Sequence, residues 1–556
     1  MDSKHDDSPT ADSSDPRPRG LWDSLNHWVF WPPFLLLLAA IVLNFVAPDE
    51  YVDGVNVGRF FTVVNGANNW ILDHFGWLFA LCAFLAVILC IAICITCFWK
   101  SGFGNVRIGG KEAKPLMSLW NWFSITVCTT IAIGILFWST AEPISHLIPG
   151  INSTPLPGLG IEPGSHDAAV FALSTMYLHW SFTPYALYCV VSLMFAFAYY
   201  NMRQPFSLGS TLTPLFGKWS TGRGSYLIDA VCLYSLVAGM AAALGAGILM
   251  LNGGMHDLWG VPNKNEWVLG AIALAIVLTF IVSSATGLMK GIRILSDVNT
   301  KLLICLAFVP LIFGPTVFIF SLGWEALIEY VVEFFPRNLT MTQNEAGQTR
   351  ILVPDKWGKS WTVFYWAVWI AWAPITACFL GRIAYGRTVR EFMLVNFIFP
   401  SLFSIAWMTI FSGSALYYQL EGLADLALVY ETQGAEAVSF ELFKQFPGST
   451  VLIVFYMFSA FVCFVTSSDS NMSAMSAISS TGISPKNPEG NKWLKIVWGL
   501  TVGTVSWIMI CFAGGVEGVK MLSNLGGFPT AFLELLVIAA LLRVVFFHRS
   551  LNVVDR

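Results

Sequence analysis

The stretch WTVFYWAVWIAW, residues 361–372, holds six aromatic side chains in twelve positions. It lies inside an apolar run, residues 357–383, that is long enough to cross the roughly 30 Å hydrocarbon core of a bilayer as a helix. Trp and Tyr usually lie at the two water interfaces of a membrane. Trp369, however, is roughly 18 Å into this run, at mid-bilayer depth. The stretch therefore predicts a transmembrane helix with an aromatic face in the middle of the membrane.

The composition of the whole chain indicates the same class of protein. Of its 556 residues, 56% are hydrophobic and only 12% are charged, whereas soluble domains average about 25% charged residues. We therefore predict a polytopic membrane protein. The small net charge of -4 gives no reason to expect a nucleic-acid partner. The eleven cysteines all fall in apolar segments, so we interpret them as packing residues rather than as disulfides.

Twelve apolar runs are long enough to span a bilayer. They are residues 28–47, 74–99, 117–143, 167–200, 226–255, 266–286, 301–322, 357–383, 391–418, 449–474, 493–514 and 520–547. The prediction is an all-α integral membrane protein with twelve transmembrane helices in the lipid bilayer.

Lysine and arginine are concentrated in alternate loops between these runs. They follow runs two, four, six and eight: Lys100, Arg107, Lys111, Lys114, Arg203, Lys218, Arg223, Lys290, Arg293, Arg382, Arg387 and Arg390. The intervening loops are poor in Lys and Arg, except 323–356, which is also rich in Glu. Because basic loops remain in the cytoplasm, we predict a protein of the inner (plasma) membrane with both termini cytoplasmic. The Asp-, Ser- and Pro-rich N-terminus predicts a disordered tail.

Two of the predicted outer segments have amphipathic spacing. EALIEYVVEFFPR, residues 325–337, places apolar side chains at helical intervals on one face. GLADLALVYE, residues 422–431, does so more weakly. Both patterns fit helices that lie on the outer interface, and ordinary ordered loops are the alternative.

Small and polar residues interrupt runs three and ten. Run three contains SITVCTTIAIGILFWSTAEP, residues 124–143, and run ten contains FVCFVTSSDSNMSAMSAISS, residues 461–480. Gly and small hydroxyl residues permit unwinding or close helix packing, and irregular backbone within a membrane must line protein or a polar cavity. The intramembrane acid Asp469 favours a functional site, because such acids are costly. We therefore expect both helices to be broken, with Glu142 at the outer end of the third.

Enzyme signatures are absent from the sequence. There is no GxxxxGK[ST] motif for ATP, no HExxH motif and no Cys/His cluster for a metal. Of the eight histidines only His179 lies clearly within a run, and we interpret it as a hydrogen-bonded packing residue rather than a proton relay. We expect neither an enzyme nor a resident cofactor.

A second aromatic group lies in run four. YLHWSFTPYALY, residues 177–188, places Trp180 and Tyr188 on one side of a helix, with Tyr185 displaced. Pro184 should bend the chain beside them. Aromatic faces attract cations most strongly where water is excluded. Two such groups at one depth therefore fit a cage for a quaternary ammonium compound, and packing of helix against helix by the same rings is the alternative.

The sequence resembles a known transporter family at these positions. WTVFYWAVWIAWAPITACFLGRIAYGRTVREF, residues 361–392, is similar to the signature of the betaine/choline/carnitine transporter (BCCT) family, and AEP at 141–143, HW at 179–180 and TSSDS at 466–470 stand where that family has them. The resemblance implies a secondary transporter that imports a small zwitterionic or cationic compound of the betaine, choline, carnitine or dimethylsulfoniopropionate class. An uncoupled channel or a sensor is the alternative from another class.

The resemblance also implies an architecture. Family members resemble the leucine-transporter fold with two inverted five-helix repeats, and they usually form trimers. The implied divisions are a disordered cytoplasmic tail (1–25), two peripheral transmembrane helices (26–110), a first repeat with the outer amphipathic helix (111–356), a second repeat (357–547) and a cytoplasmic tail (548–556). In a homotrimer, residues 325–337 would be a candidate for the subunit contact.

For the substrate site the resemblance implies an aromatic box from runs four and eight. Its positions are Trp180, Tyr185, Tyr188, Trp369 and Trp372. Val368 stands where many members have Trp. Gly134 stands at the third glycine of the family's Gly-x-Gly-x-Gly motif, where proton-coupled choline members tend to have an acid. The box is thinner than usual, which leaves room for a larger or less methylated substrate than glycine betaine.

For the coupling ion the resemblance implies Na⁺. Thr466 and Ser467 match the hydroxyls of the family's sodium site on run ten, and hard cations prefer such oxygens. The backbone around Ala132 on run three would complete the site. Two departures weaken the match: the glycine motif reads TIAIG, residues 130–134, and residues 241–243 are alanines where a second proposed site has threonines. Sodium symport is favoured, with proton symport and substrate exchange as alternatives.

Overall fold

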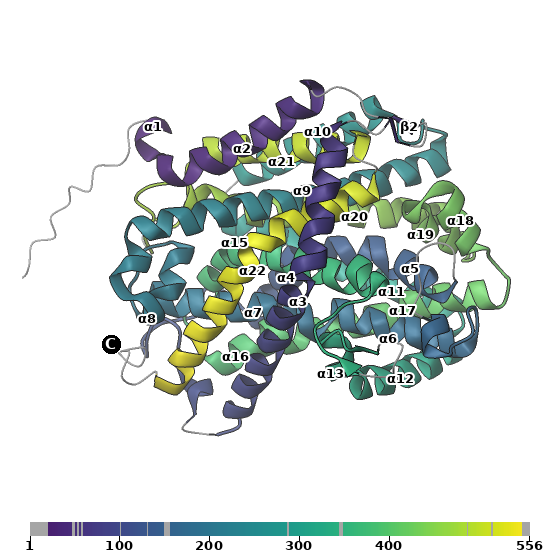
Figure 1. Cartoon of the computed structure of the whole chain (residues 1–556), viewed down its shortest axis with the longest axis horizontal. Helices are drawn as coiled ribbons and strands as arrows, with labels where there is room; N and C mark the ends of the chain where they lie inside the picture. Colours follow the sequence, from purple (N-terminus) through teal and green to yellow (C-terminus); the bar gives the residue numbers. More distant parts are fainter. Residues whose placement is uncertain are drawn as a thin grey trace, which may run out of the picture.

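The computed structural model is an assembly of helices (Figure 1). It describes residues 21–46, 51–52, 55–56, 59–99, 102–130, 132–148, 156–285, 288–343, 349–485, 487–512 and 515–547. The tail predicted at 548–556 and residues 1–20 of the tail predicted at 1–25 lie outside these residues. Within the described residues the strands form two short hairpins: β1 (Tyr51–Val52) with β2 (Val55–Asn56), and β3 (Thr342–Gln343) with β4 (Thr349–Arg350).

The long helices follow the predicted apolar runs in order. They are α2 (His27–Val46), α3 (Arg59–Thr96), α4 (Leu119–Thr130), α5 (Ala132–Leu147), α6 (His166–Trp180), α7 (Phe182–Ala196), α9 (Arg223–Trp259), α10 (Glu266–Ala285), α11 (Leu288–Phe313), α15 (Phe364–Ile383), α17 (Phe399–Leu420), α20 (Ser449–Ile478), α21 (Lys492–Phe512) and α22 (Val516–Phe547). Other helices precede, extend or connect them: α1 (Leu21–Ser24), α8 (Thr213–Phe216), α12 (Thr316–Val332), α13 (Phe334–Asn338), α14 (Lys356–Gly358), α16 (Val389–Met393), α18 (Leu426–Gln433) and α19 (Ala435–Phe443).

These helices make the chain a multi-pass membrane protein. In the part of the chain that the structure describes, nine helical spans are long and apolar enough to cross a membrane, and α4 with α5 makes a tenth if the pair, bent by 55°, is one span. Helices α2 and α10 are apolar but shorter, so the predicted total of twelve is not confirmed. The run predicted at 301–322 was placed too late, because Gly314 and Pro315 separate α11 from α12 within one apolar stretch.

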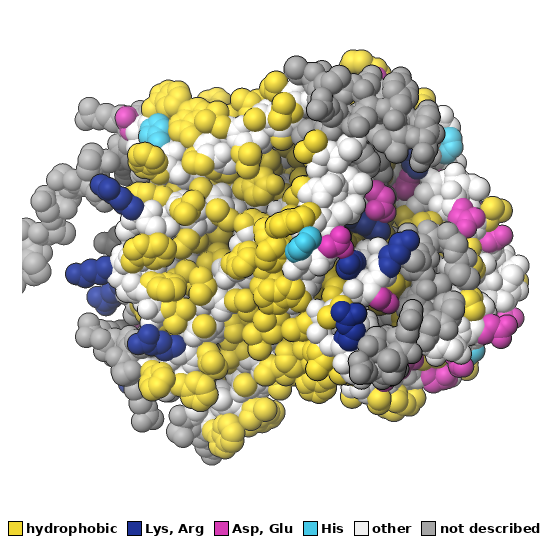
Figure 2. Space-filling model, in the orientation of Figure 1, with side chains coloured by type: hydrophobic (Ala, Val, Ile, Leu, Met, Phe, Trp, Pro, Cys, Tyr) yellow, Lys and Arg dark blue, Asp and Glu magenta, His cyan; other side chains and the backbone are white. Residues whose placement is uncertain are grey.

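Charged side chains distinguish two ends of the molecule. In Figure 2, Lys and Arg project from the left edge, an apolar band follows, and most acidic side chains lie to the right, together with further Lys and Arg. We call these the basic end and the acidic end. Helix α8 lies at the basic end, and α12, α13, α18 and α19 lie at the acidic end (Figure 1). The segments predicted to lie outside, 325–337 in α12–α13 and 422–431 at the start of α18, are therefore on the acidic side.

Only one of the two helices expected to break does so. Run three is divided after Thr130, where α4 gives way to α5. Run ten forms one continuous helix, α20, so the expected break in it is wrong. Its hydroxyls bond carbonyls of the same helix without unwinding it: Thr466 Oγ1 donates to Val462 O at 2.7 Å, and Ser470 Oγ donates to Thr466 O at 3.0 Å.

Prolines inside the spans leave carbonyls that other helices bond. Pro143 in α5 lacks the N–H that would pair with the carbonyl of Ser139. Ser412 Oγ of α17 donates to that carbonyl at 2.6 Å. Thr530 of α22 does the same beside Pro374 of α15, donating to the freed carbonyl four residues before it at 3.2 Å. Because hydrocarbon offers no hydrogen bonds, these contacts stabilise bent spans inside the bundle.

Candidate binding site

A small cavity of about 50 Å³ lies between α4–α5, α6, α9, α15, α20 and α22. We call it the central cavity. It is lined by Thr130, Gly134, Phe137, Trp138, Trp180, Gly239, Ala242, Ala243, Ala246, Phe364, Tyr365, Val368, Trp369, Trp372, Ser467 and Ser523. The wall is thus mainly aromatic, α9 contributes only glycine and alanine, and the polar groups are hydroxyls.

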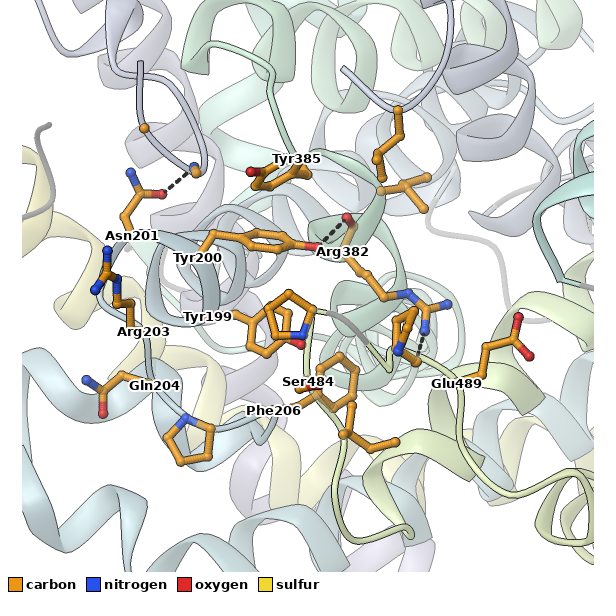
Figure 3. Close-up of a pocket in the computed structure, with 18 of the residues that line it drawn as sticks. Tyr199, Tyr200, Asn201, Arg203, Gln204, Phe206, Arg382, Tyr385, Ser484 and Glu489 are labelled. Atoms are coloured by element: carbon orange, nitrogen blue, oxygen red, sulfur yellow. Dashed lines mark hydrogen bonds between the residues drawn. The ribbon is translucent and has the colours of Figure 1, made fainter. Parts of the chain in front are cut away.

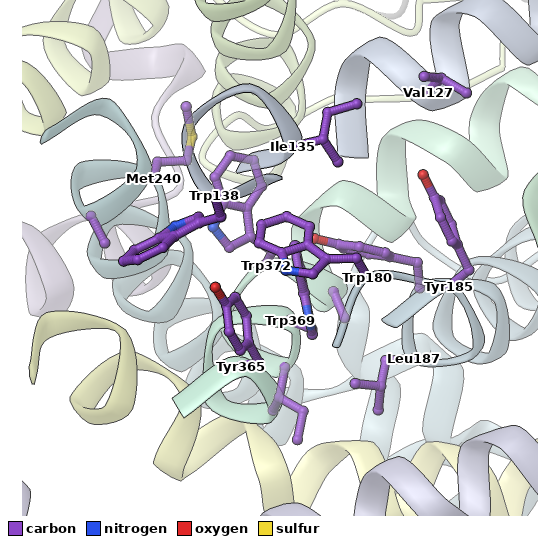
Figure 4. Packing of buried hydrophobic residues seen from close by; sticks show 14 of the residues in the cluster. Val127, Ile135, Trp138, Trp180, Tyr185, Leu187, Met240, Tyr365, Trp369 and Trp372 are labelled. Carbon is purple, nitrogen blue, oxygen red and sulfur yellow. The ribbon is translucent and has the colours of Figure 1, made fainter. Parts of the chain in front are cut away.

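Rings from two separate spans face each other at this cavity (Figure 4). Trp180 of α6 and Trp369 of α15 have ring centroids 5.1 Å apart with their planes at 82°. Tyr365 lies one turn before Trp369, and its ring centroid is 5.1 Å from that of Trp180. The exposed fractions of Trp180 and Trp369 are 1% and 4%. The two aromatic groups of the sequence therefore meet inside the protein rather than facing lipid.

Two glycines make the space that the indoles occupy. A Cβ on Gly134 of α5 would lie 2.4 Å from the six-membered ring of Trp180. A Cβ on Gly239 of α9 would lie 2.7 Å from Cδ1 of Trp372. Both distances are well inside van der Waals contact, so any larger residue at either position displaces a ring. Gly134, which the sequence singled out, therefore shapes the wall as well as lining it.

Not every residue predicted for the box reaches the central cavity. Gly134, Trp180, Val368, Trp369 and Trp372 line it, whereas Tyr185 and Tyr188 do not. Tyr188 packs behind the wall, with its ring centroid 6.2 Å from that of Trp369. Tyr185 lies apart from the tryptophans in Figure 4. Run four breaks at Ser181, between α6 and α7, so residues after the break do not follow the spacing of one straight helix.

That break supplies a hydrogen bond to the wall. Trp369 Nε1 donates to the backbone carbonyl of His179 at 3.1 Å. His179 is two residues before Ser181, where the backbone leaves helical geometry. Pro184 has no N–H for the carbonyl of Trp180, which accounts for a break slightly ahead of the proline that predicted a bend. The irregular turn and the indole of the facing span therefore stabilise each other.

One carboxylate holds two of the rings. Glu142 of α5 is fully buried and accepts four hydrogen bonds. Its Oε2 accepts from Trp180 Nε1 at 2.8 Å and from the Tyr365 hydroxyl at 2.5 Å. Its Oε1 contacts His179 Nδ1 at 2.7 Å and His146 Nε2 at 3.3 Å. A carboxylate has about four lone-pair positions, so this one is fully used, and it links three spans.

The two histidines beside Glu142 are oriented by contacts of their own. Trp357 Nε1 donates to His146 Nδ1 at 3.4 Å. Because an indole N–H can only donate, this contact places the His146 proton on Nε2, facing Glu142. His179 Nε2 lies 3.0 Å from Thr362 Oγ1. The contacts agree with the interpretation of His179 as a hydrogen-bonded packing residue.

The same three residues correct one expectation from the sequence. Ligand atoms of Glu142, His146 and His179 lie within 4.8 Å of one another, so the absence of a sequence motif did not exclude a group of metal-ligand type. Glu142 and Tyr365 were also missed as site residues. The available signals were the spacing of Glu142 and His146, one helical turn apart, and the position of Tyr365 one turn before Trp369.

A lysine shows that aromatic faces near the cavity accept a cation. Lys520 of α22 is 6% exposed. Its Nζ lies 4.3 Å from the ring centroid of Trp361 and 5.6 Å from that of Phe364, which also lines the cavity. Its other partner is the carboxylate of Glu517, at 3.2 Å. Cation–π attraction of this kind is the main interaction open to a quaternary ammonium, which has no N–H to donate.

The residues predicted to bind sodium lie at the break in run three. Ser467 Oγ of α20 donates to the carbonyl of Thr129 at 3.1 Å, which brings α20 against the end of α4. The Thr466 hydroxyl bonds its own helix at Val462 O. Ala132 is the first residue of α5, and its side chain is outside the described part. The last carbonyls of a helix lack helical partners, and carbonyl and hydroxyl oxygens are the ligands that hard cations prefer.

The sequence matches a family model and several characterised relatives. Residues 28–548 match the family model described as BCCT, betaine/carnitine/choline family transporter. An ectoine/hydroxyectoine transporter of Virgibacillus pantothenticus is 28% identical over 521 residues, which are 94% of this chain and 97% of the relative. A glycine betaine transporter of Bacillus subtilis (strain 168) is 29% identical over 516 residues, 92% and 93% of the two chains. A high-affinity choline transport protein of Escherichia coli (strain K12) is 30% identical over 498 residues, 88% and 68% of the two chains.

Proposed function

The chain belongs to the betaine/carnitine/choline transporter family, and we propose that it imports a quaternary-ammonium or related zwitterionic compound by secondary active transport. It is a transporter and not an enzyme. The proposed substrates are the betaine, choline, carnitine and dimethylsulfoniopropionate class named above, extended to ectoine by the similarity to an ectoine/hydroxyectoine transporter.

The observation that carries this proposal is the meeting of Trp180 and Trp369, whose ring centroids are 5.1 Å apart on the wall of the central cavity. The two rings touch edge to face and come from different spans, so a guest in the cavity that they line contacts both spans. A permanently charged, methylated nitrogen gains from several aromatic faces at once where water is excluded. A neutral solute is stabilised there only by burial of its apolar surface and lacks the cation–π attraction, which makes the wall selective for cationic head groups.

We propose sodium as the coupling ion. Ser467 and the Thr129 carbonyl support this assignment, because they place oxygen ligands from α20 and α4 within 3.1 Å of each other beside the central cavity. Ser467 also lines that cavity, so an ion at this point would lie next to the substrate. The ion would attract the carboxylate of a zwitterionic substrate, so binding of one would favour binding of the other, which is the requirement for symport.

We propose the leucine-transporter-like arrangement, with spans three to seven and eight to twelve as inverted repeats and both termini cytoplasmic. The break in run three beside the cavity supports it, because that fold places discontinuous helices at the substrate site. The basic end would then face the cytoplasm of the inner (plasma) membrane. A homotrimer with α12–α13 at its contact completes the proposal, and exposed Trp324, Ile328 and Phe335 on these helices are apolar groups that such a contact would cover.

Uptake by proteoliposomes tests the function. Radiolabelled glycine betaine, choline, carnitine, ectoine and dimethylsulfoniopropionate are each offered with an inward sodium gradient, with a proton gradient and with neither. We expect sodium-driven accumulation of at least one of them. The Trp369→Ala variant should abolish that uptake, whereas Trp366→Ala, which removes an equally buried indole that does not line the cavity, should retain it per folded molecule.

Two results would contradict the proposal. Equal uptake by Trp369→Ala and the wild type would mean that the ring only packs helices together. Downhill flux without stimulation by substrate on the opposite side would indicate a channel, since a carrier shows trans-stimulated exchange and a pore does not.

A further inference from the structure

A second cavity lies at the basic end, away from the rings described above. Its volume is about 1030 Å³, and it is formed by the connections between runs two and three, four and five, eight and nine, and ten and eleven. The wall includes Tyr199, Tyr200, Arg382, Tyr385 and Glu489 (Figure 3). We call it the basic-end cavity. Arg382 lies ten residues after Trp372 on α15, which separates the two cavities by about 15 Å along one helix.

Arg382 is a buried cation whose hydrogen bonds, in the described part of the chain, go to uncharged groups. It is 5% exposed, and its guanidinium donates to Pro488 O at 2.8 Å and to Ser473 Oγ at 3.5 Å. Among the described residues, no Asp or Glu oxygen lies within 4.0 Å of that guanidinium. Arg387, at 7% exposure, instead pairs with Glu391 at 3.2 Å. An unpaired buried charge is costly, so the Arg382 guanidinium is placed to bind an anion from outside the protein.

The rest of the wall does not neutralise this charge. Arg203 and Arg293 line the same cavity, and Glu489 is the one acidic residue on its described wall. Glu489 interacts electrostatically with Arg382, but it is exposed, so water weakens this attraction. The cavity therefore has an excess of positive charge, which attracts a carboxylate and repels a ligand that carries only a positive charge.

Aromatic rings line the same cavity. The ring centroids of Tyr200 and Tyr385 are 4.8 Å apart, and those of Tyr199 and Tyr200 are also 4.8 Å apart. The Tyr200 hydroxyl donates to the backbone carbonyl of Arg382 at 2.9 Å, which fixes this ring next to the arginine. In Figure 3, Tyr200 and Tyr385 lie near the backbone of Arg382, and the guanidinium extends toward Glu489. The cavity thus combines an anion-binding group with faces that bind a methylated cation.

We propose that the basic-end cavity is a second, weaker site for small zwitterions that carry a carboxylate, with the carboxylate on Arg382 and the cationic group on Tyr200 and Tyr385. Choline, which has a hydroxyl in place of the carboxylate, binds there poorly. The identity of the ligand class rests on the proposed function. The site lies at the end proposed to face the cytoplasm, so a zwitterionic substrate occupies it after leaving the central cavity.

Equilibrium binding to purified protein tests this site without requiring transport. The Trp369→Ala variant, which disables the central cavity, is titrated with radiolabelled glycine betaine and with choline. We expect one remaining millimolar site for glycine betaine, with choline at least about tenfold weaker because a charge-assisted bond to the guanidinium is missing. Adding Arg382→Gln should weaken glycine betaine at least about tenfold for the same reason.

Matched variants separate binding from folding. Arg223→Gln removes an exposed arginine that does not line the cavity and should change glycine betaine binding by less than about threefold. Arg382→Lys keeps the charge without the planar fork and should give an intermediate affinity, which tests the site if Arg382→Gln is not recovered as folded protein.

The two proposals fail in different ways. Equal glycine betaine binding with and without Arg382→Gln, or choline binding as tight as glycine betaine, would overturn the second site. So would wild-type protein that binds glycine betaine while Trp369→Ala binds none. Absence of wild-type uptake for every compound tested would instead overturn the proposed function. Glycine betaine binding with and without Arg382→Gln would still test the basic-end cavity.

Discussion

The indole N–H of Trp180 donates to the carboxylate of Glu142 across 2.8 Å. Glu142 does not itself line the central cavity, yet it sets the position of a ring that does. The hydroxyl of Tyr365 bonds the same oxygen, so one residue of α5 fixes rings on both α6 and α15. The geometry of the aromatic wall therefore depends on a buried charge behind it.

Replacing that charge should weaken substrate binding more than removing one of its partners. In Glu142→Gln the side-chain NH₂ faces at least one of the four groups that donate to the carboxylate, so that hydrogen bond is lost. A hydrogen bond to a charged group contributes roughly 1.5–3 kcal/mol. We expect the KM for uptake to rise at least about tenfold, with a smaller rise in Tyr365→Phe, which loses a single bond. Initial-rate uptake by equal amounts of folded protein measures both. An unchanged KM in Glu142→Gln would show that the carboxylate does not position the rings.

A single methyl group on α5 should close the site. Gly134→Ala places a Cβ 2.4 Å from the Trp180 ring, so the ring must move and its contacts with Trp369 and Glu142 are disturbed. We expect uptake to be lost while the protein still purifies as a folded species. Gly413→Ala of α17 is the matched control, because its Cβ meets nothing nearer than 3.6 Å. Normal uptake in Gly134→Ala would show that the wall tolerates displacement of this indole.

The sodium dependence of uptake should depend on Ser467. Its hydroxyl reaches the Thr129 carbonyl on another helix, at 3.1 Å. Ser459 is also buried on α20 but bonds Phe455 O of its own helix at 2.9 Å. We expect Ser467→Ala to raise the sodium concentration for half-maximal uptake about tenfold or more, through loss of a hard oxygen ligand, and Ser459→Ala to leave it unchanged. Identical sodium curves for the two variants would remove Ser467 from the ion site.

The hydrogen bond from Ser412 to the Ser139 carbonyl, which Pro143 leaves without a helical partner, can be tested with a double-mutant cycle of Ser412 and Pro143. Ser412→Ala removes the bond to the Ser139 carbonyl, and we expect a loss of about 1 kcal/mol in the free energy of unfolding. In a Pro143→Ala background the new N–H can pair with that carbonyl, so the same substitution should cost less. Melting temperatures of the four proteins in one detergent give the comparison. Equal losses in both backgrounds would show that the proline does not create the need for the serine.

The order of the helices could be predicted because hydrophobic length is a strong signal in a membrane protein. Errors arose where an apolar stretch conceals a boundary. Gly314 and Pro315 divide α11 from α12 without any change in hydrophobicity, so the seventh run was placed too late. Run ten was expected to break because of its serines, but a serine in a helix can bond its own backbone, and sequence does not reveal which bond it makes.

The candidate site was predicted in part, for a related reason. Trp180, Trp369 and Trp372 were found because helical spacing puts aromatic residues on one face. Tyr185 and Tyr188 were assigned to the wall by the family resemblance, whereas helical spacing grouped Tyr188 with Trp180 and left Tyr185 displaced. The turn at Ser181 changes the spacing after it. Glu142 was assigned only to the outer end of a span. His146 lies one helical turn from it, but its other three partners come from residues far apart in the chain, and no spacing rule brings these together.

The hydrogen bonds made by Trp180 and Trp369 have a consequence for the thermodynamics of binding. Each indole N–H is already engaged, one with Glu142 and the other with the His179 carbonyl, so neither ring has free rotation to lose when a guest arrives. Preorganised groups of this kind spare the roughly 0.5–1.5 kcal/mol that each side chain otherwise forfeits in rotamer entropy. In the proposed site, the substrate is therefore recognised by preorganised rings. Variants that remove the hydrogen-bond partner of an indole but keep its ring should bind a wider range of substrates at lower affinity.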